Sequence, residues 1–407
     1  MMEKHELRAA SSLAAVFSVR MLGLFMVYPV FAAFARHLAG ATPYKIGVAL
    51  GIYGLSQGAL QIPFGALSDR IGRKTMIVVG LILFGIGSAV AAHASTIDGM
   101  IGGRLLQGAG AIGSVVLALV ADLTAENNRT QAMALVGITI GFSFLVAIVT
   151  GPAIAGWVGV AGIFWLMVAL ALAGIAITLL VVPVAPRPHV QPEAETVPAL
   201  IGASLRNPEL LRLNFGIFAL HAMLTASFLV VPALLHGTLA MSGRDQWRVY
   251  LPVLLVSVAV MVPAILVAER YRRMKTVLVG AVAALAVSQL MLALGGQDPY
   301  LLLAGLVLFF AGFNVMEASL PSLVTRTAPA GSTGTATGIY SSSQFLGIFA
   351  GGVIGGWVHQ AAGTAAVFLF AAAIASLWLW VAATMRGQGL GYDGGRVPMT
   401  ARRGSER

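Results

Sequence analysis

The chain has 407 residues, of which 58% are hydrophobic and only 10% are charged. A soluble domain carries about 25% charged residues, and so little polar surface could not cover a soluble core of this length. The composition therefore excludes an ordinary soluble protein and indicates an integral membrane protein. Cysteine is absent, which excludes disulfides, a thiol nucleophile and a thiolate metal site.

The net charge of +10 comes from Lys and Arg residues in short loops between apolar segments. These residues form no basic patch with interleaved aromatic side chains, which nucleic-acid binding would require. We therefore expect the lipid bilayer, and no nucleic acid, as the partner of this surface.

Apolar segments long enough to span a bilayer, which takes about 20 residues, follow one another along the chain. We expect them at 12–36, 45–68, 75–94, 98–122, 131–157, 161–183, 211–236, 247–268, 276–295, 299–325, 333–358 and 362–385. The charged N-terminal segment leads into a full-length span, unlike a cleaved signal peptide. The sequence predicts an all-α integral membrane protein with twelve transmembrane helices in two six-helix bundles.

The distribution of basic residues predicts the orientation. If the N-terminus is cytoplasmic, most Lys and Arg residues fall in cytoplasmic segments. The exceptions are Arg36, Lys45, Arg244 and Arg248 on the opposite side of the membrane, and Arg20 and Arg104 within spans. This asymmetry follows the positive-inside rule. We therefore expect both termini in the cytoplasm and a multi-pass protein of the bacterial inner (cell) membrane.

One long proline-rich polar connection divides six spans from six. We expect an N-terminal bundle at 1–184, a cytoplasmic linker at 185–210, a C-terminal bundle at 211–386 and a short cytoplasmic tail at 387–407.

The two halves resemble each other at a constant offset of 200 residues. Asp69-Arg70 recurs as Glu269-Arg270, and Gly156-Trp157 recurs as Gly356-Trp357. Charged residues that match at a fixed offset argue against chance similarity between apolar helices. The pattern predicts a duplicated six-helix unit whose copies share one orientation.

The loop between the second and third spans reads GALSDRIGRK over residues 65–74. Two glycines in it allow close helix approach and a tight turn, and its acidic and basic residues can pair across helix junctions with Asp122 at the end of the fourth span. We expect a conformational latch formed by Gly65, Asp69, Arg70, Gly72, Arg73, Lys74 and Asp122. Alternatively, the basic residues only set the orientation in the membrane.

Four ionisable residues lie well inside spans: Arg20, Arg104, His221 and Glu317. Such residues are costly in a membrane and normally face a cavity or a partner. Glu317 is the one carboxylate placed deep in a span, where burial disfavours its charged form and suits a proton carrier. His221 is the second proton-coupling candidate. The alternatives are a structural carboxyl, a satisfied histidine, and snorkelling of Arg104 to the surface.

Polar residues within spans complete a predicted substrate cavity. Its members are Arg20, Tyr28, Arg104, Gln107, Asn214, His221, Asn314 and Gln344. We expect a bend of the fifth span at Gly151 and Pro152. His221 and Met223 lie on different helix faces and no carboxylate cluster accompanies them, so we expect no metal site. No nucleophile–base pair is present either, and we expect no enzyme activity.

These motifs resemble a known family. Residues 65–74 resemble the signature loop of the major facilitator superfamily, and RLLQGAG at 104–110 is similar to its second motif. GPAIAG at 151–156 resembles the motif associated with exporters, although Ala147 and Ala155 stand where glycines are usual. Further stretches that carry the resemblance are RMLGLFMVYP at 20–29, DLT at 122–124, LNFG at 213–216 and SQFLG at 343–347. With these motifs the chain is similar, over roughly 8–386, to the YajR-type branch of the drug:proton antiporter group.

The resemblance implies a secondary active transporter, with spans 1, 4, 7 and 10 lining its cavity. It implies proton-coupled export of small amphipathic molecules or drugs by alternating access, driven by the proton gradient without a cofactor; we expect a monomer. Two features depart from the family. A small soluble domain follows the last helix in this branch, where we expect only a short tail, and Arg20 stands in a span that often carries an acidic residue. The alternatives are an importer or uniporter of a specific metabolite and a non-transporting membrane sensor.

Overall fold

The computed structural model describes residues 2–183, 197–296, 298–329 and 332–385. Within these ranges the chain is helical and contains no strand beyond an isolated bridge between Ala39 and Thr96. The helices are α1 (Lys4–Ala35), α2 (Pro43–Ile71), α3 (Arg73–Ala92), α4 (Ile97–Ala109), α5 (Gly113–Asp122), α6 (Glu126–Leu180), α7 (Val197–Arg206), α8 (Pro208–Leu239), η1 (Gly243–Asp245), α9 (Trp247–Arg270), α10 (Met274–Leu294), α11 (Pro299–Thr327) and α12 (Thr333–Ala383). The predicted all-α membrane fold is confirmed.

Twelve membrane crossings follow from these helices. In the described part of the chain, nine helical stretches are long and apolar enough to span a bilayer, with α4 and α5 counted as one. Two of the nine, α6 with 55 residues and α12 with 51, are each a pair of spans joined at a kink. The twelfth crossing is α2, which is 29 residues long and less apolar because glutamine, serine and glycine occupy much of its length.

The two kinks depend on glycine. Gly159 in α6 has φ +70° and Gly363 in α12 has φ +80°, a backbone conformation that strains residues with a Cβ atom. A second pair of positive φ angles, at Gly72 and Arg272, lies at the predicted offset of 200 residues. Matching backbone turns at matching places in the two halves support the duplicated unit.

The span predicted at 98–122 is confirmed at Ile97–Asp122, and within it the structure divides the helix into α4 and α5. The interruption at Gly110 lies where the chain packs closest to α3: a Cβ on Gly110 would collide with the carbonyl oxygen of Gly80. Close backbone approach therefore outweighs the continuity of the apolar run.

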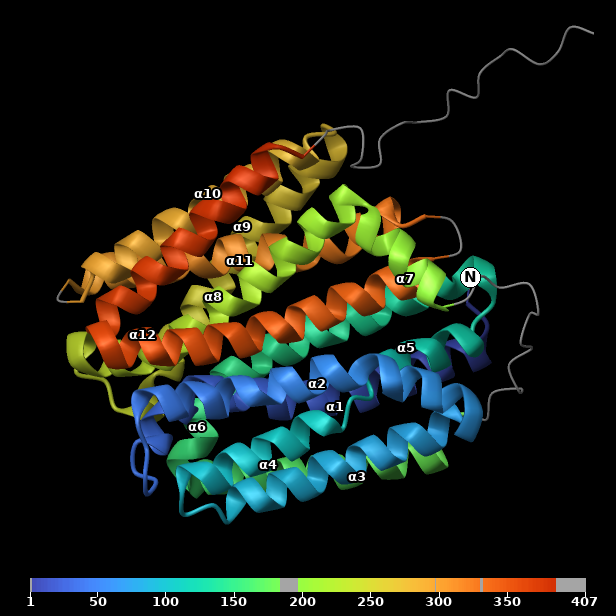
Figure 1. The fold of residues 1–407 in the computed structure, drawn as a ribbon, viewed down its shortest axis with the longest axis horizontal. Coiled ribbons are helices and arrows are strands. Elements are labelled where there is room, and N and C mark those ends of the chain that lie inside the picture. The colour runs from blue at the N-terminus through green and yellow to red at the C-terminus, as the bar shows by residue number, and fades with distance from the viewer. Residues whose placement is uncertain (1, 184–196, 297, 330–331, 386–407) are drawn as a thin grey trace, which may run out of the picture.

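Figure 1 shows the two halves, with α1 to α6 in blue to green and α8 to α12 in yellow-green to red, and with α2 and α12 side by side between them. We call the end of the bundle with the α2–α3 turn the Asp69 end and the end where α2 begins the Thr42 end. Within the predicted linker, α7 packs against α8 and α12. The part of the predicted linker that precedes α7, 185–196, and the predicted tail at 387–407 lie outside the described residues.

The halves pack tightly near the Thr42 end. A Cβ on Gly47 or Gly54 of α2 would collide with backbone atoms of α12, a close approach that small residues permit in membrane proteins. Hydrogen bonds cross between the halves from Tyr44 N to Gln360 Oε1 (3.2 Å), between Tyr28 Oη and Thr225 Oγ1 (3.3 Å), and from Ser342 Oγ to the carbonyl oxygen of Gly58 (3.3 Å). The conformation is therefore closed at the Thr42 end.

Candidate functional site

An ion-pair network joins three helices at the Asp69 end. Because Gly72 turns with φ +102°, α3 begins beside the last turn of α2. Arg73 Nη1 lies 2.6 Å from Asp69 Oδ1, and Arg73 Nε lies 3.1 Å from Asp122 Oδ2 at the end of α5. Arg73 Nη1 also donates to Ser68 Oγ at 2.6 Å. The guanidinium therefore holds the ends of α2, α3 and α5 together within the N-terminal half.

The other residues of the predicted latch lie around this network. Lys74 Nζ donates to the carbonyl oxygen of Val182 at 2.9 Å, which ties the turn to the end of α6. A Cβ on Gly65 would lie 3.4 Å from Ser114 Oγ of α5, so α2 and α5 are in close contact there. Arg70 is exposed and takes no part in the network.

Sequence reasoning missed Glu6, a nearly buried carboxylate at the start of α1 with 3% exposure. Its Oε1 accepts a hydrogen bond from Ala125 N at 2.7 Å, and its Oε2 accepts from Asn128 Nδ2 at 2.7 Å and from Glu3 N at 2.9 Å. The start of the first span is thereby fixed to the turn between α5 and α6. Two glutamates three residues apart before an apolar run are a capping signal that could have flagged it.

Three polar side chains of the C-terminal half meet at one place. His221 of α8 lies 2.8 Å by its Nε2 from Gln344 Nε2 of α12 and 3.9 Å from Glu317 Oε2 of α11. His221 Nδ1 lies 3.3 Å from the carbonyl oxygen of Ile217, and a carbonyl can only accept. The contacts therefore fit an uncharged ring that donates through Nδ1 and accepts at Nε2 from the Gln344 amide.

Glu317 is the least satisfied member of this trio. Its Oε2 has no hydrogen-bond partner among the described residues, whereas its side chain as a whole is 33% exposed. One carboxylate oxygen is thus turned into the protein towards His221 and the rest of the group is open to the surroundings. A carboxyl group in such a position can gain or lose a proton without breaking a network.

The two arginines predicted for the cavity are packed inside the N-terminal half. Arg20 is 0% and Arg104 is 1% exposed. Arg20 Nη2 donates to Gln57 Oε1, and Arg104 Nη1 donates to Gln107 Oε1 at 2.9 Å. Both guanidinium carbons lie over the Tyr53 ring, at 5.8 and 5.0 Å from its centre, a distance at which cation–π attraction contributes. The Arg104 side chain is therefore buried in the N-terminal half and does not extend to the surface.

The remaining predicted cavity residues are dispersed. Gln107 Nε2 donates to Ser88 Oγ of α3 at 2.8 Å, and Asn314 Nδ2 donates to Ser257 Oγ of α9 at 2.8 Å. Asn214 is buried, and its Oδ1 has no partner within the part of the chain that the structure describes. The role of these residues in a cavity stays a prediction.

An aromatic cluster between the halves also escaped sequence reasoning. The ring of Phe144 in α6 lies 4.9 Å from that of Phe25 and stacks at 5.4 Å on Phe313 of α11. Phe313 lies 5.8 Å from the His221 ring. These ring contacts join α1 and α6 of the N-terminal half to α11 of the C-terminal half beside His221.

The predicted bend residues belong to α6, in which Pro152 lies inside the helix and a kink occurs at Gly159. A Cβ on Gly151 would lie 2.5 Å from the carbonyl oxygen of Met26. The glycine therefore permits close packing of α6 on α1, and a bend at Gly151 and Pro152 stays a prediction.

Comparisons with known proteins agree with this architecture. A sequence model of the Major Facilitator Superfamily matches residues 13–352 and 253–390. The inner membrane transport protein YajR of Escherichia coli K12 is 46% identical over 384 residues, which covers 94% of this chain and 84% of that protein.

Two further similarities are more distant. The class E tetracycline resistance protein of Escherichia coli is 31% identical over 141 residues, 34% of each chain. A bacterial homologue of the human lysosomal transporter Spinster, solved in an inward-facing and unoccupied conformation, superposes with a TM-score of 0.71 at 14% identity and covers 95% of this chain and 98% of its own. At this identity the likeness shows the fold alone.

Proposed function

Because the chain belongs to the Major Facilitator Superfamily, we propose that it exports small amphipathic molecules, drugs included, in exchange for protons. It is a multi-pass membrane transporter similar to YajR. The partial similarity to a tetracycline resistance protein favours efflux of drug-like molecules. We propose that it acts as a monomer and needs no cofactor beyond the proton gradient.

The orientation belongs to the proposal. The Asp69 end carries the basic turn at residues 70–74, and the positive-inside rule assigns such a turn to the cytoplasm. With both termini cytoplasmic in the inner membrane, the conformation described above is closed to the outside. Substrate would then enter from the cytoplasm and leave after the halves rock and part at the Thr42 end.

The observation that carries proton coupling is the position of Glu317. A charged group within a membrane span costs about 2.5–3.5 kcal/mol on insertion scales. In Glu317, Oε2 has no hydrogen-bond partner in the described part of the chain and lies 3.9 Å from His221 Nε2. A proton that enters from outside would neutralise the carboxylate. The protein would then change conformation, and Glu317 would release the proton on the cytoplasmic side. Exchange requires that the protonated and the ionised forms of Glu317 differ in their affinity for the substrate, so that substrate and proton compete.

The network around Arg73 has a conformational role in this proposal. It fixes the end of α2, the helix whose glycine face packs against α12. When the halves rock, α2 must change its contacts with α12, and the ion pairs at its end would stabilise one of the two arrangements.

The test is Glu317→Gln in proteoliposomes. The amide keeps the shape of the protonated acid, so substrate should still bind, whereas substrate-driven proton movement and the pH dependence of binding should vanish. Asp98→Asn is the matched control, because Asp98 is an exposed carboxylate paired with Lys45 at 2.9 Å outside the site, and it should couple normally.

The outcomes separate the alternatives. Normal coupling in Glu317→Gln would refute the assignment and make His221 the next candidate. Substrate flux into the cytoplasm by the unmodified protein would instead identify an importer, and flux without proton movement would identify a uniporter.

A further inference from the structure

A cavity of about 130 Å³ lies between the halves at the Thr42 end. One water requires roughly 10–15 Å³ of such volume, so the cavity has room for a small organic molecule. Its lining residues are Ala32, Arg36, Ala41, Thr42, Pro43 and Ile46 of the N-terminal half and Leu229 and His359 of the C-terminal half. Neither the trio of His221, Glu317 and Gln344 nor the Arg73 network contributes to it.

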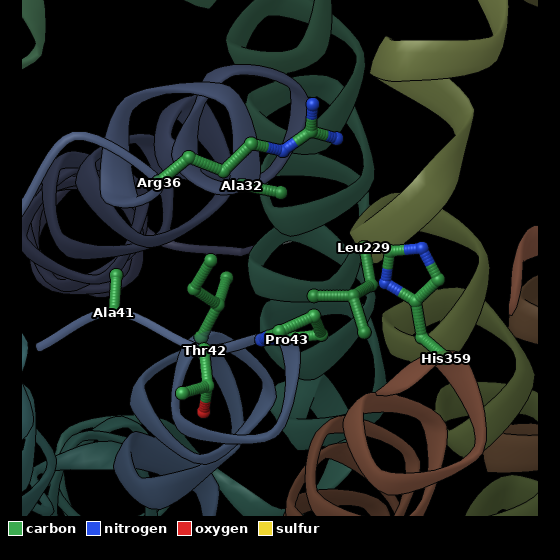
Figure 2. A pocket seen from close by; sticks show the side chains of 8 residues that line it. Ala32, Arg36, Ala41, Thr42, Pro43, Leu229 and His359 are labelled. Carbon is green, nitrogen blue, oxygen red and sulfur yellow. The ribbon is translucent and has the colours of Figure 1, made fainter. Parts of the chain in front are cut away.

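The polar lining of this cavity is basic. Figure 2 shows Arg36 at the end of α1 and His359 of α12 entering from opposite halves. No acidic residue lines the cavity. The Arg36 guanidinium has no hydrogen-bond or ion-pair partner among the residues that the structure describes. The dipole at the start of α2 adds further positive potential.

The first turn of α2 has no free N–H group to offer. Tyr44 N donates to Gln360 and Lys45 N donates to the Thr42 hydroxyl, and Pro43 has no N–H. Arg36 and His359 are therefore the groups that would hold a ligand. An arginine presents a planar pair of donors that matches a carboxylate, and the other walls of the cavity are apolar.

We propose that this cavity binds a small carboxylate with a short alkyl chain. The carboxylate accepts hydrogen bonds from Arg36 and from His359, and the alkyl chain contacts Ile46 and Leu229. Since the two basic side chains belong to different halves, the bound anion links the halves and stabilises the conformation closed at the Thr42 end. The cavity is thus a regulatory site separate from the transport path.

The binding test uses purified protein in detergent at constant ionic strength, with sodium butyrate as the probe and butyramide as the uncharged match. Butyrate should raise the melting temperature in a saturable way, and butyramide should not. Arg36→Gln should raise the half-saturating butyrate concentration at least about tenfold, the size expected when a charge-assisted hydrogen bond is lost. Arg248→Gln, an exposed arginine at the same end, should bind butyrate normally.

The linkage test uses a single cysteine at Thr225, which is buried between the halves next to Tyr28. Butyrate should slow its labelling by a membrane-impermeant maleimide from the Thr42 end, and Arg36→Gln should abolish this effect. His359→Gln serves as a second variant with the same expectation if Arg36→Gln does not fold.

Equal stabilisation by butyramide, or an unchanged half-saturation in both variants, would overturn the site. Stabilisation by phosphatidylglycerol alone would overturn the assignment to a soluble carboxylate. Binding without any change in Thr225→Cys labelling would overturn the link between the halves.

Discussion

Replacement of Asp122 by Asn should perturb the Arg73 network more than replacement of Asp69. The Asp69 side chain is 56% exposed, so its pair with Arg73 resembles a surface ion pair, which contributes at most about 1 kcal/mol. The Asp122 side chain is only 25% exposed and accepts from Arg73 Nε at 3.1 Å. A hydrogen bond to a charged group contributes about 1.5–3 kcal/mol.

These energies predict a shift in conformation rather than a loss of folded protein. If the network favours the conformation closed at the Thr42 end, about 1.4 kcal/mol changes the ratio of the two conformations tenfold. Asp122→Asn should therefore increase labelling of Thr225→Cys from the Thr42 end by about tenfold or more. Asp69→Asn should change it by less than about fivefold, and both variants should lose transport while they remain folded.

The assay compares maleimide labelling rates, substrate flux and melting temperature in the same preparations. Glu209→Gln is the matched control, because Glu209 pairs with Arg212 of its own helix at the Asp69 end of the other half. The conformational role of the network would be refuted by two results together. Asp122→Asn and the control would be labelled at the same rate, and transport would fall only in proportion to the amount of folded protein.

Two further predictions concern topology and the packing between the halves. Single cysteines introduced at 70–74, 187–206 and 390–400 should react with impermeant reagents from the cytoplasmic side only. The native chain has no cysteine that would react in the background. Labelling of any of these positions from outside would overturn the orientation. Gly47→Ala should cost about 1–3 kcal/mol of overpacking and should speed labelling of Thr225→Cys, because its Cβ would collide with the α12 backbone. Gly237→Ala, where a Cβ meets open space, is its control, and equal behaviour of the two alanine variants would contradict the tight α2–α12 contact.

The local features of this protein were predictable from the chain itself. The membrane spans follow from apolar length, because the cost of a polar residue in the bilayer applies to each residue separately. For the same reason Glu317 was conspicuous before its neighbours were known. The turn at Gly72 and the pairing of Arg73 with Asp69 were also readable, since both residues lie in the loop at 65–74.

The contacts between distant segments were not predictable in this way. Glu6 and Ala125, or Phe144 and Phe313, lie more than a hundred residues apart in the chain and meet only because particular helix faces pack together. The interruption between α4 and α5 likewise depends on the approach of Gly80 from another helix.

The sequence by itself determined which segments enter the bilayer and which few ionisable groups enter with them; their orientation is a prediction from the positive-inside rule. Only the tertiary structure decided that Arg20 and Arg104 are buried within one half, that His221, Glu317 and Gln344 meet, and that Arg36 and His359 face one cavity. The physical reason is that transfer into a membrane is a sum over single residues. A pairing between helices instead depends on the rotation and crossing of each helix, which all of its neighbours set together.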